Sequence, residues 1–228
     1  MAATANPCQV WTHDVFNLIS LAVMIPLILH YMYLYSWQTL VPEWGMSDEQ
    51  QSEGVVDEQK LELEEKFYNF FVFFVTYLII DTIVIYLYPF CVVSSPKSLI
   101  FHHCLLLPLC VVPFSHKRYH WYMILGLTTE INTFFIVLRR QLQLYPKSLV
   151  YQICNIMFYV TWIVLKLLLF PFLSYLFLKE YVIYSSEVAN YVNLTMIAPV
   201  LMVSLTGLSY KWTYDMLSKI LTNKQKVL

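Results

Sequence analysis

The segment "YNFFVFFVTYLIIDTIVIYLYPF" (residues 68–90) is apolar along almost its whole length and carries a single charge, at Asp81. A helix of about 20 apolar residues is long enough to cross the hydrocarbon core of a bilayer. A carboxylate inside such a helix is costly unless it has a partner, which makes Asp81 a candidate functional residue. The segment therefore predicts a membrane span with a polar site inside it.

Five further segments have the same character, and the composition of the whole chain agrees with them. The 228 residues are 59% hydrophobic and only 13% charged, whereas about 25% of the residues in soluble domains are charged. No basic patch indicates a nucleic-acid partner. We expect an all-α membrane protein with six transmembrane helices, at residues 15–35, 68–90, 99–114, 119–138, 149–178 and 189–210.

The rest of the chain divides around these segments. Nine of the fifteen acidic residues lie at residues 43–65, which is typical of a solvated loop. The first apolar segment has no basic residues before it and is long enough to span, so we interpret it as a retained helix and not as a signal peptide. Pro171 in the long fifth segment predicts a kink or tilt. The expected parts are a cytosolic N-terminus, a first transmembrane helix, an acidic luminal loop, the main membrane domain and a basic cytosolic tail, at residues 1–14, 15–35, 36–66, 67–212 and 213–228.

Lysine and arginine predict the orientation of the chain. With six crossings both termini share one face, and eight of the fourteen cations fall on that face against five on the other. An excess of cations marks the cytosolic side, so we expect both termini in the cytosol. The tail "KQKVL" (residues 224–228) places Lys224 and Lys226 as in a dilysine retrieval signal of endoplasmic reticulum proteins, which coat proteins recognise. The alternative is a basic tail attracted to anionic lipid headgroups.

Four more ionisable residues lie inside the predicted spans: His102, His103, Glu130 and Lys166. At 1.5 Å per residue, Asp81, Glu130 and His102 lie roughly 13, 12 and 5 Å from the cytosolic ends of their helices. These are depths that side chains can bridge. We expect Lys166 to form an ion pair with an interior acceptor, and we expect no bound metal or other cofactor because no third ligand follows the histidines at a metal-site spacing.

The adjacent histidines point in different directions, because neighbouring helix positions differ by about 100°. We expect one of them to face an interior cavity and the other to hydrogen-bond a neighbouring helix. A neutral imidazole backed by an acid serves as a general base or as an acyl-accepting nucleophile. The alternative is that His102 and His103 only satisfy hydrogen-bond acceptors between helices.

Asp81, the pair His102–His103 and the segment "TEINTFFIVLRR" (residues 129–140) together resemble the TLC domain family, whose members include ceramide synthases and their non-synthase relatives. The resemblance covers about residues 65–212. Members outside the synthase branch carry Glu, then Ser-Thr-Pro-Phe, then Asn and Arg. This chain matches at Glu130, Thr133, Phe135 and Arg139, and has different residues at Asn132, Phe134 and Val137. The His-Asp-x-x-Asp signature of ceramide synthases is absent.

This resemblance implies a helical barrel around a lipid-sized cavity in the endoplasmic reticulum. In the synthase branch the histidine pair is linked to acyl transfer from acyl-CoA, so the resemblance implies acyl-CoA as a co-substrate. It further implies a catalytic group made of His102, His103, Glu130 and Asp81. It also implies that the substrate is bound by Thr133 and Arg139. Histidines near the cytosolic surface would meet a thioester whose CoA stays in the cytosol while the acyl chain enters the barrel.

Three functions are open at this point. The first is an acyl-CoA-dependent lipid acyltransferase, and the second is a non-catalytic lipid-binding protein that regulates membrane composition; both have membrane lipids as partners. The third is a cargo adaptor cycling between the endoplasmic reticulum and the Golgi, with coat proteins as partners. An adaptor needs no buried acids and histidines, so the sequence favours the first two.

Overall fold

The computed structural model describes residues 7–40, 53–92 and 95–225. These residues form helices joined by short connections, and no strand occurs among them. The helices are α1 (Pro7–Leu40), α2 (Glu53–Leu87), η2 (Pro89–Cys91), α3 (Pro96–Ser115), η3 (Lys117–Tyr119), α4 (His120–Leu127), α5 (Glu130–Gln141), η4 (Leu142–Leu144), α6 (Leu149–Thr161), η5 (Trp162–Leu169), α7 (Phe170–Glu187), η6 (Leu194–Met196) and α8 (Ile197–Gln225).

Six stretches among the described residues are long and apolar enough to cross a membrane, which confirms the predicted all-α class with six spans. Most of the boundaries differ from the prediction by a few residues, whereas the last stretch runs about twelve residues further and the fifth runs through α6, η5 and α7 to Glu187. The stretches are Cys8–Leu34, Glu65–Leu87, Pro96–Ser115, His120–Leu144, Leu149–Glu187 and Leu194–Thr222.

The first helix begins earlier than the sequence indicates. We predicted residues 1–14 as a tail before the span, but α1 starts at Pro7 and carries His13 and Asp14 inside the bundle. A proline is favourable at the start of a helix because its φ angle is preset and its missing N–H is not needed there. The helices also extend into the predicted loop at residues 36–66, of which residues 41–52 lie outside the described part of the chain.

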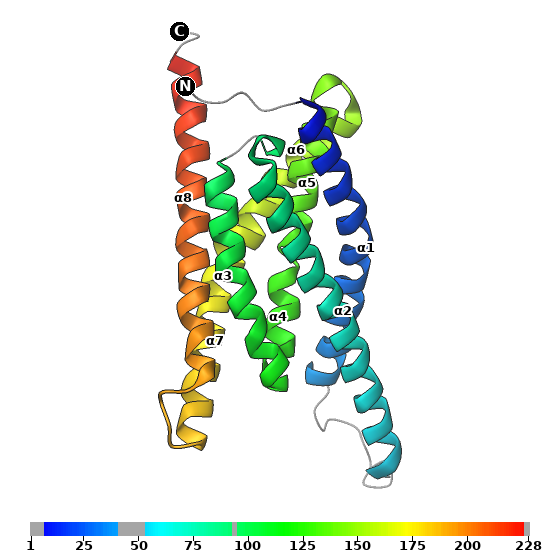
Figure 1. Ribbon diagram of the computed structural model, residues 1–228, viewed down its shortest axis with the longest axis vertical. Helices are drawn as coiled ribbons and strands as arrows, with labels where there is room; N and C mark the ends of the chain where they lie inside the picture. Colours follow the sequence, from blue (N-terminus) through cyan, green and yellow to red (C-terminus); the bar gives the residue numbers. More distant parts are fainter. Residues whose placement is uncertain (1–6, 41–52, 93–94, 226–228) are drawn as a thin grey trace.

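The spans form a closed ring. Neighbouring helices contact each other in the order α1, α2, α3, α8, α7, η5, α6, α5 and back to α1, where α6, η5 and α7 form the fifth span, while α4 contacts α1, α3 and α7. Figure 1 shows that the start of α1 and the end of α8 lie at the same end of the bundle. The connections that follow α2 and α5 also lie there. We call this end of the bundle the terminal end.

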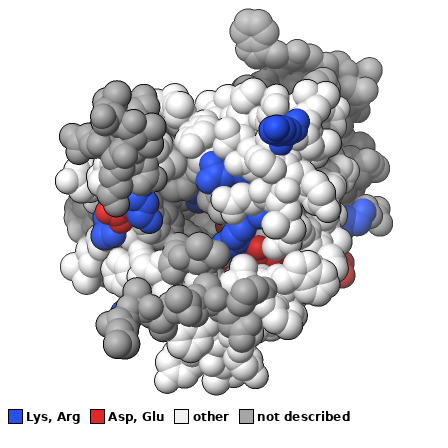
Figure 2. All heavy atoms as spheres, turned by 90° about the horizontal axis from the view of Figure 1, so that it is seen from above, with Lys and Arg blue, Asp and Glu red and all other residues white. Residues whose placement is uncertain are grey.

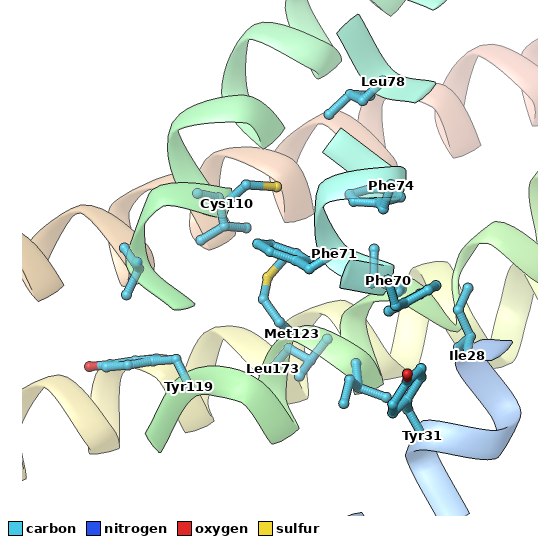
Figure 3. Close-up of a cluster of buried hydrophobic side chains, with 14 of the residues drawn as sticks. Ile28, Tyr31, Phe70, Phe71, Phe74, Leu78, Cys110, Tyr119, Met123 and Leu173 are labelled. Atoms are coloured by element: carbon cyan, nitrogen blue, oxygen red, sulfur yellow. The ribbon is translucent and has the colours of Figure 1, made fainter. Parts of the chain in front are cut away.

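Aromatic residues fill the interior on the side away from the terminal end. Phe71 is fully buried and stacks on Phe67 with ring centres 5.4 Å apart, and Tyr31 of α1 stacks on Phe70 of α2 at 5.2 Å. Figure 3 shows Tyr31, Phe70 and Phe71 in one cluster with Cys110 of α3 and Met123 of α4. Because lipid chains are as apolar as these side chains, close van der Waals packing stabilises the contacts between the helices. This packing closes one half of the barrel.

The fourth span is broken at its middle. The amides of Thr128 and Thr129 bond to the carbonyls three residues before them, and the Thr128 hydroxyl donates to the Leu125 carbonyl at 2.6 Å. Such three-residue bonds form a tighter turn than an α-helix, and a hydroxyl that bonds back to the chain bends it. A new helix, α5, therefore starts at Glu130.

The fifth span contains a π-helix, η5, which ends at Leu169, directly before the pair Phe170–Pro171. A proline ring clashes with the carbonyl four residues earlier and cannot donate to it. The wider π turns leave room for that carbonyl, so the irregularity that we predicted at Pro171 takes this form. Inside membranes such distortions are tolerated where they line a protein interior.

Candidate functional site

Asp81 is buried, and its closest partner is His13. The Nε2 atom of His13 lies 2.8 Å from Asp81 Oδ1, within hydrogen-bonding distance. His103 Nε2 lies 3.6 Å from the other carboxylate oxygen, which is an electrostatic contact but too long for a hydrogen bond. Two histidines, from α1 and α3, thus face the two oxygens of one carboxylate on α2.

The same cluster continues along α1 and α2. The Asn17 amide nitrogen lies 3.2 Å from His13 Nε2, and the Tyr77 hydroxyl donates to Asn17 Oδ1 at 2.7 Å. All three of these side chains are buried. We call His13, Asn17, Tyr77, Asp81 and His103 the Asp81 cluster. Its hydrogen bonds join α1 to α2, and the electrostatic contact of His103 with Asp81 adds α3, inside the bundle where an unpaired polar group is costly.

His103 is held by a second contact that indicates its tautomer. Its Nδ1 lies 2.9 Å from the Thr82 hydroxyl oxygen, and that hydroxyl donates to the Leu78 carbonyl at 2.6 Å. Because the Thr82 proton goes to Leu78, the oxygen accepts from His103, and we assign the proton of the ring to Nδ1. His103 is therefore the histidine that hydrogen-bonds a neighbouring helix.

His102 lies on the other side of α3 and faces a cavity. Its Nδ1 is buried and has no hydrogen-bond partner among the described residues. The ring packs 5.4 Å from the ring of Trp212, whose indole nitrogen donates to Ser98. A buried nitrogen without a partner is unusual in a protein interior and calls for an explanation. His102 is the imidazole that remains available for a ligand.

The cavity beside His102 also contains Glu130. It is enclosed between α3, α4, α5, α7 and α8 and has a volume of about 20 Å³, room for about one water molecule. Gly126 and Thr129 contribute to its wall at the break in the fourth span. His102 and Glu130 therefore both line this cavity, and their predicted joint role stays a prediction.

Lys166 approaches this group from the π-helix. It is 4% exposed, and its Nζ lies 4.8 Å from the centre of the Phe170 ring. It interacts electrostatically with both Glu130 and His102. Thr133 lies three residues after Glu130 on α5, so the two side chains share one face of that helix. We call His102, Glu130, Thr133 and Lys166 the Glu130 cluster.

The two arginines of α5 have separate partners. Arg139 donates to the Asn155 side chain at 3.2 Å, and its guanidinium lies 4.2 Å from the centre of the Phe158 ring, so it is turned toward α6. Arg140 donates through Nε to Asp14 at 2.7 Å. Thr133 thus joins the Glu130 cluster, whereas Arg139 lies outside it.

Charged side chains also gather at the terminal end. Figure 2 shows this end face hollowed near its centre, with basic and acidic side chains in and around the hollow. Lys97, Lys147 and Lys211, which are exposed there, belong to the eight cations predicted for the cytosolic face. The predicted retrieval signal is not tested, because the Lys224 side chain and all of Lys226 lie outside the described residues.

Sequence reasoning missed His13 and Asp14, which precede the first apolar run. A weak signal was present, since His13 and Asn17 are four residues apart and so share one helix face. It also missed the role of Lys166 as the electrostatic partner of Glu130, although it expected an interior acceptor for that lysine.

The comparison with protein families agrees with this architecture. A family model described as the TLC domain matches residues 10–218, which is nearly the whole chain and includes both polar clusters. No curated protein and no solved structure matches the chain. With six spans in a closed ring and the family model over almost its full length, the chain is a multi-pass membrane protein that belongs to the TLC domain family, which indicates a role in lipid metabolism or homeostasis.

Proposed function

We propose that this protein is a lipid acyltransferase that uses acyl-CoA, with His102 as its base. One observation carries the proposal: His102 and Glu130 line the same enclosed cavity, and the buried Nδ1 of His102 has no partner among the described residues. Leaving a polar atom unsatisfied in a membrane interior is costly. A substrate group that donates or accepts a proton there would supply the missing partner.

The reaction transfers an acyl group from sulfur to oxygen or nitrogen. A lipid hydroxyl or amine attacks the carbonyl carbon of the thioester, a new carbon–oxygen or carbon–nitrogen bond forms, and the carbon–sulfur bond breaks. The proton of the attacking group passes to His102 and then to the sulfur of the departing CoA, so no other reactant is needed. General base catalysis of this kind contributes about 10²–10⁴-fold.

The other polar residues have distinct roles in this proposal. Lys166, whose charge acts on both Glu130 and His102, stabilises the negative charge that develops on the thioester oxygen. Glu130 balances that cation and orients His102. The Asp81 cluster holds α1, α2 and α3 together and fixes His103, which positions the preceding residue, His102.

The closed cavity requires a movement before substrate enters. A volume of about 20 Å³ admits a water molecule but not an acyl chain. The wall most able to move is the break at Thr128 and Thr129, because it lacks the regular bonds of an α-helix. We therefore expect binding to be accompanied by a change in this segment.

The test compares His102→Ala with a matched variant, His120→Ala. His120 is more deeply buried than His102, bonds the Pro113 carbonyl at 3.0 Å and stacks on Phe67, but it does not line the cavity. The assay is transfer of a labelled acyl group from acyl-CoA to lipids of nanodiscs containing the purified protein. We expect His102→Ala to lower the rate about 10²–10⁴-fold with an unchanged melting temperature, and His120→Ala to lower the melting temperature with less loss of rate.

Two further variants separate catalysis from structure. Glu130→Gln keeps the shape and removes the charge, so we expect an intermediate loss of rate. His103→Ala removes contacts to Thr82 and Asp81, so we expect it to lower stability as well as rate. If the wild-type protein transfers no acyl group, or if His102→Ala leaves transfer intact, the enzymatic proposal is wrong. Binding of lipid by such an inactive protein would support the non-catalytic lipid-binding function.

We further propose residence in the endoplasmic reticulum with both termini in the cytosol. The even number of spans and the excess of lysine and arginine on the terminal end support this orientation. Lys224→Ser combined with Lys226→Ser should move the protein forward to the Golgi or the cell surface. An unchanged distribution would show that the tail is only basic.

A further inference from the structure

A second, larger space opens on the outside of the bundle. It is a groove of about 470 Å³ between α1, the break in the fourth span and the π-helix η5. Leu29 lines it from α1, Thr128 from the break, Leu168 from η5 and Phe172 from α7. Three of these four side chains are among the exposed apolar residues of the chain. The groove therefore opens toward the lipid that surrounds the spans.

The chemistry of the groove selects hydrocarbon as its occupant. No charged residue lines it, and the one polar side chain, Thr128, donates its hydroxyl proton to the Leu125 carbonyl. A peptide or a soluble ligand would leave its polar groups without partners there. The volume is within the range of pockets that bind small molecules, about 300–1,000 Å³. Because the groove lies between membrane spans, the available hydrocarbon is the acyl chain of a bilayer lipid.

The groove and the cavity of His102 share one wall, the break in the fourth span. Leu125 and Thr128 line the groove, while Gly126 and Glu130, in the same segment, line the cavity. The π-helix η5 lines only the groove, for example at Leu168, although its Lys166 interacts with Glu130. Because the regular bonds of an α-helix are interrupted at the shared wall, this segment between lipid and polar interior is able to open.

We propose that this groove binds one acyl chain of a bilayer glycerolipid and presents the lipid head to the cavity through the break at Thr128 and Thr129. Binding in the groove stands on the geometry alone. The assignment of that lipid as the acyl acceptor rests on the proposed function. The chain stays in the hydrophobic groove while the reacting group passes between α4 and α5, so neither part of the lipid leaves the environment that suits it.

The first experiment measures occupancy of the groove. Wild-type protein in nanodiscs is irradiated with phosphatidylcholine that carries a diazirine in one acyl chain, and the cross-linked peptides are identified by mass spectrometry. We compare Leu168→Trp, which fills the groove, with Ile163→Trp, an equally lipid-exposed position on the same π-helix that does not line it. We expect cross-links at residues 125–131 to fall with Leu168→Trp to the level of other lipid-facing segments, because the indole ring occupies the volume that the acyl chain would fill.

Ile163→Trp should leave those cross-links unchanged. Cross-links spread evenly over all lipid-facing residues, or unaffected by Leu168→Trp, would show ordinary surrounding lipid and overturn the groove.

The second experiment measures the role of the groove in acyl transfer. Leu168→Trp should raise the KM for the acceptor lipid, while Ile163→Trp should leave that KM at the wild-type value. If cross-linking falls but the KM does not change, the groove binds lipid without supplying the acceptor, and that part of the proposal is wrong. If neither the wild-type protein nor any variant transfers an acyl group, the proposed function is wrong. The cross-links alone then decide whether the groove binds an acyl chain.

Discussion

Removal of the Asp14 carboxylate should destabilise the bundle by several kcal/mol. Asp14 is fully buried and accepts hydrogen bonds from two guanidinium nitrogens of Arg140, one at 2.7 Å, and from Gln141 at 2.5 Å. These contacts join α1 to the end of α5. Breaking a buried ion pair from one side costs about 3–5 kcal/mol, and the partial exposure of the Arg140 side chain, 22%, places Asp14→Ala near the lower limit. We expect about 3 kcal/mol.

A double-mutant cycle measures the pair itself. The free energy of unfolding is measured in detergent micelles for Asp14→Ala, Arg140→Met and the double variant. Because removing both charges leaves no unpaired group, the double variant should be more stable than the sum of the single losses by about 2 kcal/mol, within the range for residues in contact.

The pair Lys211–Asp215 is the matched control for this cycle. Its atoms are 2.6 Å apart, but its side chains are 60% and 45% exposed, so Asp215→Ala should cost only about 0.5 kcal/mol. Equal losses for Asp14→Ala and Asp215→Ala, or additive losses in the cycle, would refute the argument that burial makes the Asp14 pair important.

The remaining predictions concern the cavity wall, a thiol and the orientation. Gly126→Ala should keep or raise stability, because the new Cβ meets Leu173 at an ordinary 3.7 Å and alanine favours a helix by about 1 kcal/mol. The same change should narrow the cavity and slow acyl transfer. A lower melting temperature would contradict the stability prediction. Burial and the nearby carboxylate of Asp81 raise the pKa of the Cys91 thiol to about 11. Maleimide should therefore label Cys91 far more slowly at pH 7 than the exposed Cys8, and the labelling of Cys91 should become faster as the pH rises toward 11. Mass spectrometry of the labelled peptides measures both rates, and equal rates at pH 7 would be inconsistent with the structure. Tags at the two termini should both be digested by protease added to sealed microsomes. A protected tag would contradict the predicted cytosolic position of that terminus.

Sequence reasoning predicted the spans well because hydropathy and length are properties of a single segment. An apolar run long enough to cross a bilayer becomes a helix there whatever its neighbours are, since every backbone group must bond within the segment. Asp81, His102, His103 and Glu130 were found for a related reason: a polar side chain in such a run is costly and therefore conspicuous. The divergence of the two histidines also followed from helix geometry alone.

What only the tertiary structure decided is which polar groups meet. The partner of Asp81 is His13, which stands before the apolar run, and α1 comes close enough because the closed ring places it between α2 and α5. Lys166, in the π-helix of the fifth span, interacts electrostatically with Glu130, which begins α5 after the break in the fourth span. These contacts depend on the order of helices around the ring, which is determined by the packing of all the spans at once. No single segment contains that information. The polar residues could therefore be identified from the sequence, whereas their partners are determined by the fold.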